Sequence, residues 1–290
     1  MWQHPGDGLG DRQRVIDNLA RLWLPLGLQL AQARGELNRT LILGVLGGQG
    51  TGKSTLCKLL KLILGDLGLT VATLSIDDLY LTYQERQALR QEDPRLIWRG
   101  PPGTHNIDDG MRVIDLCLSQ DDQVEIALPR FDKSLHNGAG DRLEPEVAAK
   151  PDILLFEGWF VGVRPINKSI FDNPPEPIIT EEDKQFARKC NERLQAYVPL
   201  WDKLDRLVVL LPEDYRLSQQ WRKEAEQKMK AQGKTGKSDA EIEEFVEYFW
   251  KALHPELFIQ PLTKTADLVV EITSDRSLGA IYYPQNSSGK

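Results

Sequence analysis

The pattern G-x-x-x-x-G-K-[ST] occurs at residues 47 to 54, which read Gly-Gly-Gln-Gly-Thr-Gly-Lys-Ser. An apolar run of strand length, residues 40 to 46, precedes it, and residues 55 to 64 carry apolar and basic side chains at helical spacing. A polyphosphate must approach several backbone N–H groups at once, and side chains with a Cβ would block that approach. Strand, glycine loop and helix together therefore predict a phosphate-binding loop in an α/β fold.

The residues of this loop have separate candidate roles. We expect Lys53 to contact the β- and γ-phosphates of a nucleotide, and the Ser54 hydroxyl to hold Mg²⁺. The candidate nucleotide-binding residues are Gly47, Gly48, Gln49, Gly50, Thr51, Gly52, Lys53, Ser54 and Thr55.

Composition narrows the class of protein. The 290 residues, 41% of them hydrophobic, suffice for one α/β domain with a full core or for two small domains. A net charge of −7 without a long basic stripe argues against a nucleic-acid partner. Three isolated cysteines, Cys57, Cys117 and Cys190, indicate a reducing compartment without disulfides or a metal cluster. No secretory signal or membrane-spanning run is recognised, so we expect a cytoplasmic protein with no membrane partner.

Apolar strands alternate with helices along the chain, which predicts a mostly parallel sheet covered on both faces. We expect strands at residues 40–46, 70–76, 124–128, 152–156, 204–211 and 266–273, and helices at 11–38, 55–64, 111–119, 181–197 and 214–231. A capping box of Ser238 and Glu241 predicts one more helix. Residues 82–110 are expected to be irregular, and a polar loop to continue from the 124–128 strand to about residue 144. The organisation expected is a single domain, 1–290, with an N-terminal helical cover (1–39), a helical lid (212–262) and a frayed tail (284–290).

Acidic residues follow two of the apolar strands. Asp77 and Asp78 end one strand and Glu157 ends another, and ligands of parallel sheets bind beyond the carboxyl ends of the strands. We therefore expect these carboxylates to meet the phosphate loop at one edge. Phosphoryl transfer requires a phosphate cradle, a Mg²⁺ site and a group that accepts the proton of the attacking hydroxyl. Glu157 is the candidate for Mg²⁺, and Asp77, with Asp78 as its competitor, is the candidate base.

Three segments carry a family resemblance: the phosphate loop, Ser75-Ile-Asp-Asp-Leu-Tyr-Leu81 and Phe156-Glu-Gly-Trp159. They resemble the kinases grouped with uridine kinase, phosphoribulokinase and pantothenate kinase. Arg99-Gly-Pro-Pro-Gly-Thr-His105, Leu128-Pro-Arg-Phe-Asp-Lys-Ser134, Gly140-Asp-Arg142 and Trp221-Arg222 are similar to plant-type D-glycerate 3-kinases and their fungal and bacterial relatives.

The resemblance implies a P-loop NTPase fold, a three-layer α/β sandwich with a helical lid. It also implies a monomer that uses ATP and Mg²⁺ to phosphorylate the 3-hydroxyl of D-glycerate, with Asp77 as the general base and Glu157 as the Mg²⁺-associated acid. The alternatives are a related kinase with another hydroxylated acceptor, or a nucleotide-dependent regulatory ATPase.

D-glycerate is an anion, so an acidic protein must place local cations against its carboxylate. The candidate substrate-binding residues, besides Asp77, are Tyr80, His105, Arg130, Lys133 and Arg142, with Arg99 as a further cation. Each could instead be a surface charge or order a loop, and Tyr80 could be a packing residue. Lys133 could instead follow the transferred phosphoryl group. Arg222 is expected either to act from the lid on the transferring phosphoryl group or to pair with Glu224 or Glu226 on its own helix.

Overall fold

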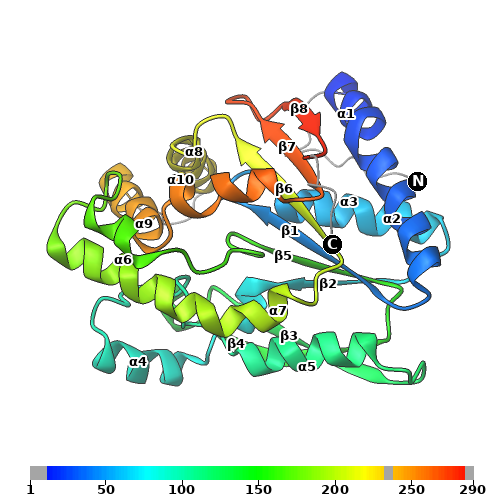
Figure 1. The fold of residues 1–290 in the computed structure, drawn as a ribbon, viewed down its shortest axis with the longest axis horizontal. Helices are drawn as coiled ribbons and strands as arrows, with labels where there is room; N and C mark the ends of the chain where they lie inside the picture. Colours follow the sequence, from blue (N-terminus) through cyan, green and yellow to red (C-terminus); the bar gives the residue numbers. More distant parts are fainter. Residues whose placement is uncertain (1–11, 232–237, 285–290) are drawn as a thin grey trace.

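The structure, a computed structural model, describes residues 12–231 and 238–284. Residues 1–11 of the expected N-terminal cover, 232–237 of the expected lid and 285–290 of the expected tail lie outside the described residues. Within the described residues, the sheet that forms the middle layer has six strands in the order β2-β5-β1-β6-β7-β8 (Figure 1). Their bounds are β1 Leu41–Gly47, β2 Val71–Ser75, β5 Ile153–Gly158, β6 Arg206–Pro212, β7 Leu268–Ile272 and β8 Leu278–Tyr282.

The pairings of β2, β5, β1, β6 and β7 are all parallel, and β8 pairs antiparallel with β7. Helices pack on both faces of this sheet, so the predicted three-layer α/β fold with a mostly parallel sheet is confirmed (Figure 1). One face is covered by α1 (Arg12–Asn18), α2 (Leu24–Leu37) and α3 (Lys53–Asp66), and the other by α5 (Ile107–Leu118), α6 (Glu181–Arg193) and α7 (Val198–Trp201).

Two buried hydrophobic clusters, one on each face of the sheet, hold the layers together. The two-residue repeat of a strand lets the same strand contribute side chains to both clusters. Along β1, Leu41, Leu43 and Val45 pack with α2 and α3, whereas Ile42 and Leu46 pack with the helices of the opposite face. Successive side chains of a strand point to opposite faces, so a strand covered on both sides must be apolar throughout. All seven residues of β1 are buried accordingly.

The remaining helices lie beyond the carboxyl ends of the strands, at the left of Figure 1: α4 (Tyr83–Glu92), α8 (Leu217–Ala231), α9 (Asp239–Ala252) and α10 (Pro255–Phe258). The predicted capping box at the start of α9 is confirmed, because the Ser238 side chain accepts from the backbone N–H of Glu241 and Glu241 accepts from that of Ser238.

The expectation of an irregular segment over residues 82–110 holds for residues 93–106 but was wrong on either side of them, where α4 and the start of α5 lie. Thr82 and Glu85 form a capping box that begins α4, a signal present in the sequence. The expected polar loop to residue 144 was also wrong: β3 (Glu125–Asp132) pairs with β4 (Asp141–Ala149) in an antiparallel hairpin. β4 is largely exposed, so it lacks the apolar residues that mark a buried strand. β8, which reads Leu-Gly-Ala-Ile-Tyr, was also missed: it is apolar but only five residues long, and an internal glycine weakens a strand pattern.

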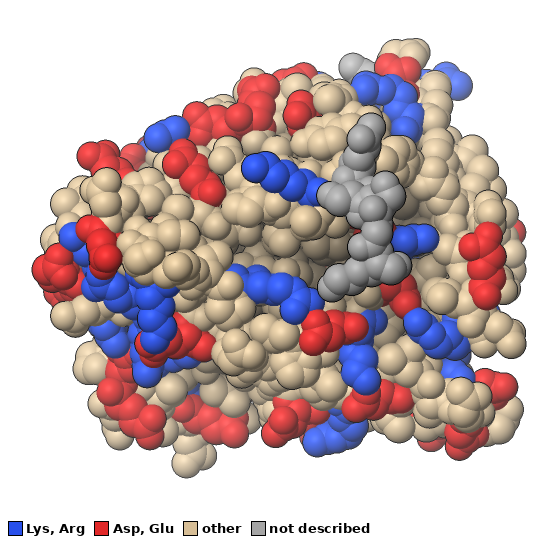
Figure 2. All heavy atoms as spheres, in the orientation of Figure 1, with Lys and Arg blue, Asp and Glu red and all other residues tan. Residues whose placement is uncertain are grey.

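Within the described residues, no helix has the length and apolar character needed to cross a membrane. On the face drawn in Figure 2, acidic and basic side chains are interspersed over most of the surface.

Candidate active site

The phosphate loop joins the carboxyl end of β1 to the N-terminus of α3, so the N–H groups of the helix start point away from the sheet toward the expected ligand. Gly50 and Gly52 have φ values of 81° and 90°, in the left-handed region that side chains with a Cβ rarely adopt. The Thr51 hydroxyl donates to the carbonyl of Gly48 at 2.9 Å, and Lys53 Nζ donates to the same carbonyl at 3.1 Å. Burial lowers the pKa of Lys53, while the nearby carboxylates of Glu157 and Asp77 favour its charged form.

Trp221 of α8 closes one side of this loop. A Cβ on Gly50 would lie 2.8 Å from the Cβ of Trp221, so the glycine is what lets the indole pack against the loop. The indole N–H donates to the carbonyl of Ser274, which follows β7, at 3.1 Å. Trp221 therefore ties the phosphate loop to both α8 and the β7 end, a role that the sequence motif did not reveal.

The Ser54 hydroxyl donates to Glu157 Oε1 at 2.9 Å, although the two residues are 103 positions apart. Parallel pairing of β1 with β5 places the ends of both strands side by side, which brings this pair together. Hydroxyl and carboxylate oxygens are ligands that Mg²⁺ accepts, usually together with substrate phosphates and water. Among the described residues, no cluster of three or more His, Cys, Asp or Glu could hold a metal alone. The pair fits a Mg²⁺ that shares its ligands with a nucleotide.

Asp77 follows β2 and faces the same cleft as Lys53 and Glu157. Its Oδ2 lies 2.6 Å from Lys133 Nζ. Burial alone would raise the pKa of Asp77, but the Lys133 ammonium and hydrogen bonds from Lys133 and Tyr80 hold it below its ordinary value. The carboxylate is therefore ionised at neutral pH. The predicted meeting of Asp77, Glu157 and the phosphate loop at one sheet edge is confirmed.

Asp78 has a different environment from Asp77. Its Oδ2 accepts from the backbone N–H of Ser75 at 2.9 Å and lies 3.4 Å from Arg130. Arg130 also pairs with Glu146 at 2.8 Å. Neither Asp78 nor Arg130 is among the described residues that line the cleft, so the structure does not bring Arg130 to the expected acceptor site.

His105 and Arg142 support Tyr80 instead of lining the cleft themselves. The Tyr80 and His105 rings stack at 4.6 Å, and His105 Nδ1 lies 2.7 Å from the Tyr197 hydroxyl. Burial lowers the pKa of His105 to about 3, so the imidazole is neutral at neutral pH. Arg142 Nε donates to the Tyr80 carbonyl at 2.8 Å, and its guanidinium pairs with Asp109 at 2.8 Å. Tyr80 itself lines the cleft.

The cleft has a volume of about 970 Å³, and basic side chains outnumber acidic ones along it. Its acidic residues, among those described, are Asp77 and Glu157. Its basic residues are Lys53, Arg86, Arg90, Arg99, Lys133 and Arg222. This excess of positive charge favours anionic ligands, although the whole chain carries −7.

Three of these arginines have partners in the protein. Arg86 donates to the carbonyls of Ala139 and Gly140 at 2.8 and 2.6 Å, and Arg99 donates to those of Gly138 and Ala139 at 2.7 and 2.9 Å. Both therefore clamp the turn of the β3–β4 hairpin. Arg86 was missed because α4 was missed. Arg222 pairs with Glu226 at 3.3 Å, which is one of the two roles expected for it from the sequence. It also lines the cleft.

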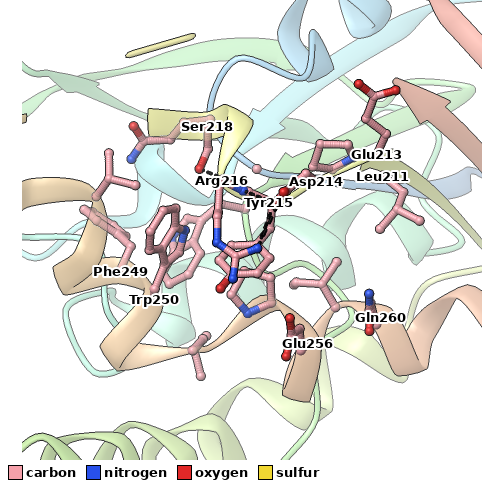
Figure 3. A pocket seen from close by; sticks show the side chains of 18 of the residues that line it. Leu211, Glu213, Asp214, Tyr215, Arg216, Ser218, Phe249, Trp250, Glu256 and Gln260 are labelled. Carbon is pink, nitrogen blue, oxygen red and sulfur yellow. Dashed lines mark hydrogen bonds and ion pairs between the residues drawn. The ribbon is translucent and has the colours of Figure 1, made fainter. Parts of the chain in front are cut away.

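Another pocket, of about 450 Å³, adjoins the cleft and shares Gln49, Trp159 and Phe249 with it (Figure 3). Aromatic rings of Tyr215, Phe249 and Trp250 form part of its wall, with the Tyr215 and Trp250 centroids 5.0 Å apart. Acidic residues predominate among its charged groups, which are Glu213, Asp214, Glu256, Glu271 and Arg216. This pocket is therefore poorly suited to a small anion, which belongs in the larger cleft.

A phosphate loop at the carboxyl edge of a parallel sheet, with a carboxylate on the acceptor side, defines the class as P-loop kinases. No family model matches the sequence. The chain is 32% identical over 254 residues to the chloroplastic D-glycerate 3-kinase of Arabidopsis thaliana, covering 83% of this chain and 54% of that protein. It is 32% identical over 219 residues to the uncharacterized kinase mug58 of Schizosaccharomyces pombe, covering 73% of this chain and 79% of that protein.

A solved structure, D-glycerate 3-kinase from Cryptococcus neoformans var. grubii, is 26% identical with a TM-score of 0.79, covering 94% of this chain and 100% of that one. The chain belongs to the D-glycerate 3-kinase family of P-loop kinases. It spans about half the length of the plant relative.

Proposed function

We propose that the protein transfers the γ-phosphoryl group of ATP to the 3-hydroxyl of D-glycerate, with Mg²⁺ as cofactor. The observation that carries this proposal is the position of Asp77, an ionised carboxylate in the same cation-rich cleft as Lys53 and the Ser54–Glu157 pair. The names of the plant and Cryptococcus relatives support D-glycerate as the acceptor.

In the proposed reaction, Asp77 accepts the proton of the acceptor hydroxyl. The hydroxyl oxygen forms a bond to the γ-phosphorus, the bond from that phosphorus to the β,γ-bridging oxygen breaks, and ADP leaves with the electron pair. Lys53 offsets the negative charge on the transferring group. Ser54 and Glu157 would hold Mg²⁺, which when bound neutralises phosphate charge.

Asp77 acts as the base in this proposal because Asp78 is engaged elsewhere. Asp78 binds the backbone N–H of Ser75 and the Arg130 guanidinium, away from the cleft lining. Tyr80 donates a hydrogen bond to Asp77 and so orients its carboxylate. Arg222, which lines the cleft from α8, would approach the transferring phosphoryl group from the lid.

The test is an ADP-release assay with D-glycerate, L-glycerate, pantothenate, uridine and ribulose 5-phosphate as separate acceptors. We expect a higher turnover rate with D-glycerate than with any of the other acceptors. Asp77→Asn should bind ATP as the parent does but lose roughly 10²–10⁴-fold in turnover, the range for removal of a general base. The neighbouring Asp78→Asn is the matched control and should keep most of the activity.

Two results would contradict the proposal. Turnover with another acceptor but not D-glycerate would place the protein among kinases with a different substrate. Slow ATP hydrolysis indifferent to every acceptor would favour a nucleotide-dependent regulatory ATPase.

A further inference from the structure

The ion pair between Lys133 and Asp77 conflicts with the proposed work of Asp77. Lys133 Nζ lies 2.6 Å from Asp77 Oδ2. A carboxylate oxygen held by an ammonium is a weaker proton acceptor, and the pair reduces the room in front of Asp77 where an acceptor hydroxyl would lie. The Lys133 ammonium must therefore leave this oxygen before that oxygen can accept the proton of an acceptor hydroxyl.

The structure makes the side chain of Lys133, rather than its backbone, the movable part. Lys133 begins the turn of the β3–β4 hairpin, and the carbonyls of residues 138–140 in that turn are held by Arg86 and Arg99. His136 of the same turn stacks on Tyr83 with the ring centroids 4.1 Å apart. The side chain of Lys133 is 59% exposed and has a flexible four-carbon stem. The ammonium can change partner while the hairpin stays in place.

The other cations of the cleft are less suited to meet the carboxylate of an acceptor. Arg86 and Arg99 bind hairpin carbonyls, and Arg222 pairs with Glu226. Lys53 is buried against the phosphate loop, and Arg90, on α4, forms no ion pair with Asp77 in the described part of the chain. Lys133 is the cation in direct contact with the proposed base, so an anion bound there lies next to the proton acceptor.

We propose that Lys133 is the specificity-determining residue that couples recognition of the acceptor's carboxylate to the release of Asp77. Without an acceptor, the ammonium stays on Asp77. When a small hydroxy acid binds, its carboxylate replaces Asp77 as the ion-pair partner of the Lys133 ammonium. The freed Asp77 oxygen then faces the hydroxyl of the acceptor. This inference rests on the proposed role of Asp77 as base, and it does not depend on which hydroxy acid is the acceptor.

The exchange has two consequences. Water is a poor acceptor, since activating it also requires Asp77: its proton would go to Asp77, its oxygen would bond to the γ-phosphorus, and the bond to the bridging oxygen would break, giving ADP and inorganic phosphate. A neutral polyol such as glycerol is also a poor acceptor, because it has hydroxyls but no anion to take the ammonium away.

The experiment compares the full chain with Lys133→Met, which keeps an unbranched side chain close to the length of lysine and removes its charge. Phosphate release from ATP without acceptor should rise roughly ten- to hundredfold in Lys133→Met, the factor for losing a charged hydrogen bond. The KM for D-glycerate should rise, and the preference for D-glycerate over glycerol in kcat/KM should fall by a similar factor. Lys133→Arg should keep hydrolysis low.

Lys168→Met is the matched control, because the side chain of Lys168 is 66% exposed and pairs with Glu192 at 2.8 Å away from the cleft lining. It should change neither hydrolysis nor the preference between acceptors. The double variant Asp77→Asn with Lys133→Met should lose the rise in hydrolysis.

Unchanged acceptor-free hydrolysis in Lys133→Met, or a rise that persists in the double variant, overturns the inference. If D-glycerate is not phosphorylated while hydrolysis still rises in Lys133→Met and falls in the double variant, the proposed substrate fails and the coupling of Lys133 to Asp77 stands.

Discussion

Replacing Gly50 by alanine tests whether the phosphate loop depends on its close packing against Trp221. A residue with a Cβ at the Gly50 φ of 81° costs about 1–2 kcal/mol in backbone strain. The new Cβ would lie 2.8 Å from Cβ and 2.9 Å from Cε3 of Trp221, a buried side chain that is also held at Ser274. Forcing an extra methyl into such a site costs about 1–3 kcal/mol. We expect Gly50→Ala to lower the free energy of unfolding by about 2–5 kcal/mol.

The assay is urea denaturation without nucleotide, which separates packing from ligand binding. Gly52→Ala is the control: its φ is 90°, but no described atom lies within 4 Å of the new Cβ, so only the strain of about 1–2 kcal/mol applies. Gly35→Ala in α2, also with no described atom within 4 Å, should stabilise by about 1 kcal/mol through helix propensity. If Gly50→Ala and Gly52→Ala lower the free energy of unfolding by the same amount, the packing argument is refuted.

Three further predictions concern the elements around the cleft. Arg86→Met should lower the free energy of unfolding by about 1.5–3 kcal/mol in urea denaturation, since hairpin carbonyls lose a charged donor; an unchanged value would contradict the clamp. Thr82→Ala should cost about 1 kcal/mol by removing the cap of α4, again measured in urea. For Asp93, burial alone would raise the pKa, but hydrogen bonds from Arg95 and Arg193 hold it below the ordinary value. The parent should therefore have a higher free energy of unfolding than Asp93→Asn at pH 7, and this difference should shrink as the pH falls below about 4. A difference that grows on acidification would contradict a lowered pKa for Asp93.

Much of the site could be predicted from local sequence because local physics determines it. The phosphate loop is recognisable from glycine conformation and the strand and helix on either side, and Glu157 from a carboxylate that ends a buried strand. The same reasoning failed for β4, which is largely exposed and lacks the apolar pattern of the central strands. It also failed for β8, which is apolar but short and interrupted by Gly279. α4 was missed although Thr82 and Glu85 signalled its start, since the polar composition of the segment outweighed the cap.

The candidate substrate residues show where sequence reasoning ends. Four of them lie in similar polar segments, and each has a side chain that can donate a hydrogen bond to an anion: Arg130, Lys133, Arg142 and His105. The fold placed Lys133 against Asp77, whereas Arg130 pairs with Glu146, Arg142 with Asp109, and His105 is buried behind Tyr80. Spacing along the chain carries no information on which of these side chains faces the cleft.

The sequence alone determined the class of chemistry, because a phosphate cradle is built from neighbouring residues whose backbone conformations depend on their own side chains. Tertiary structure decided which charges share the cleft. The Ser54–Glu157 and Asp77–Lys133 contacts join residues 103 and 56 positions apart, and both exist only after parallel strands and the hairpin have packed. Electrostatic interactions act through space over a few ångströms, so their partners are set by the packing of the whole sheet.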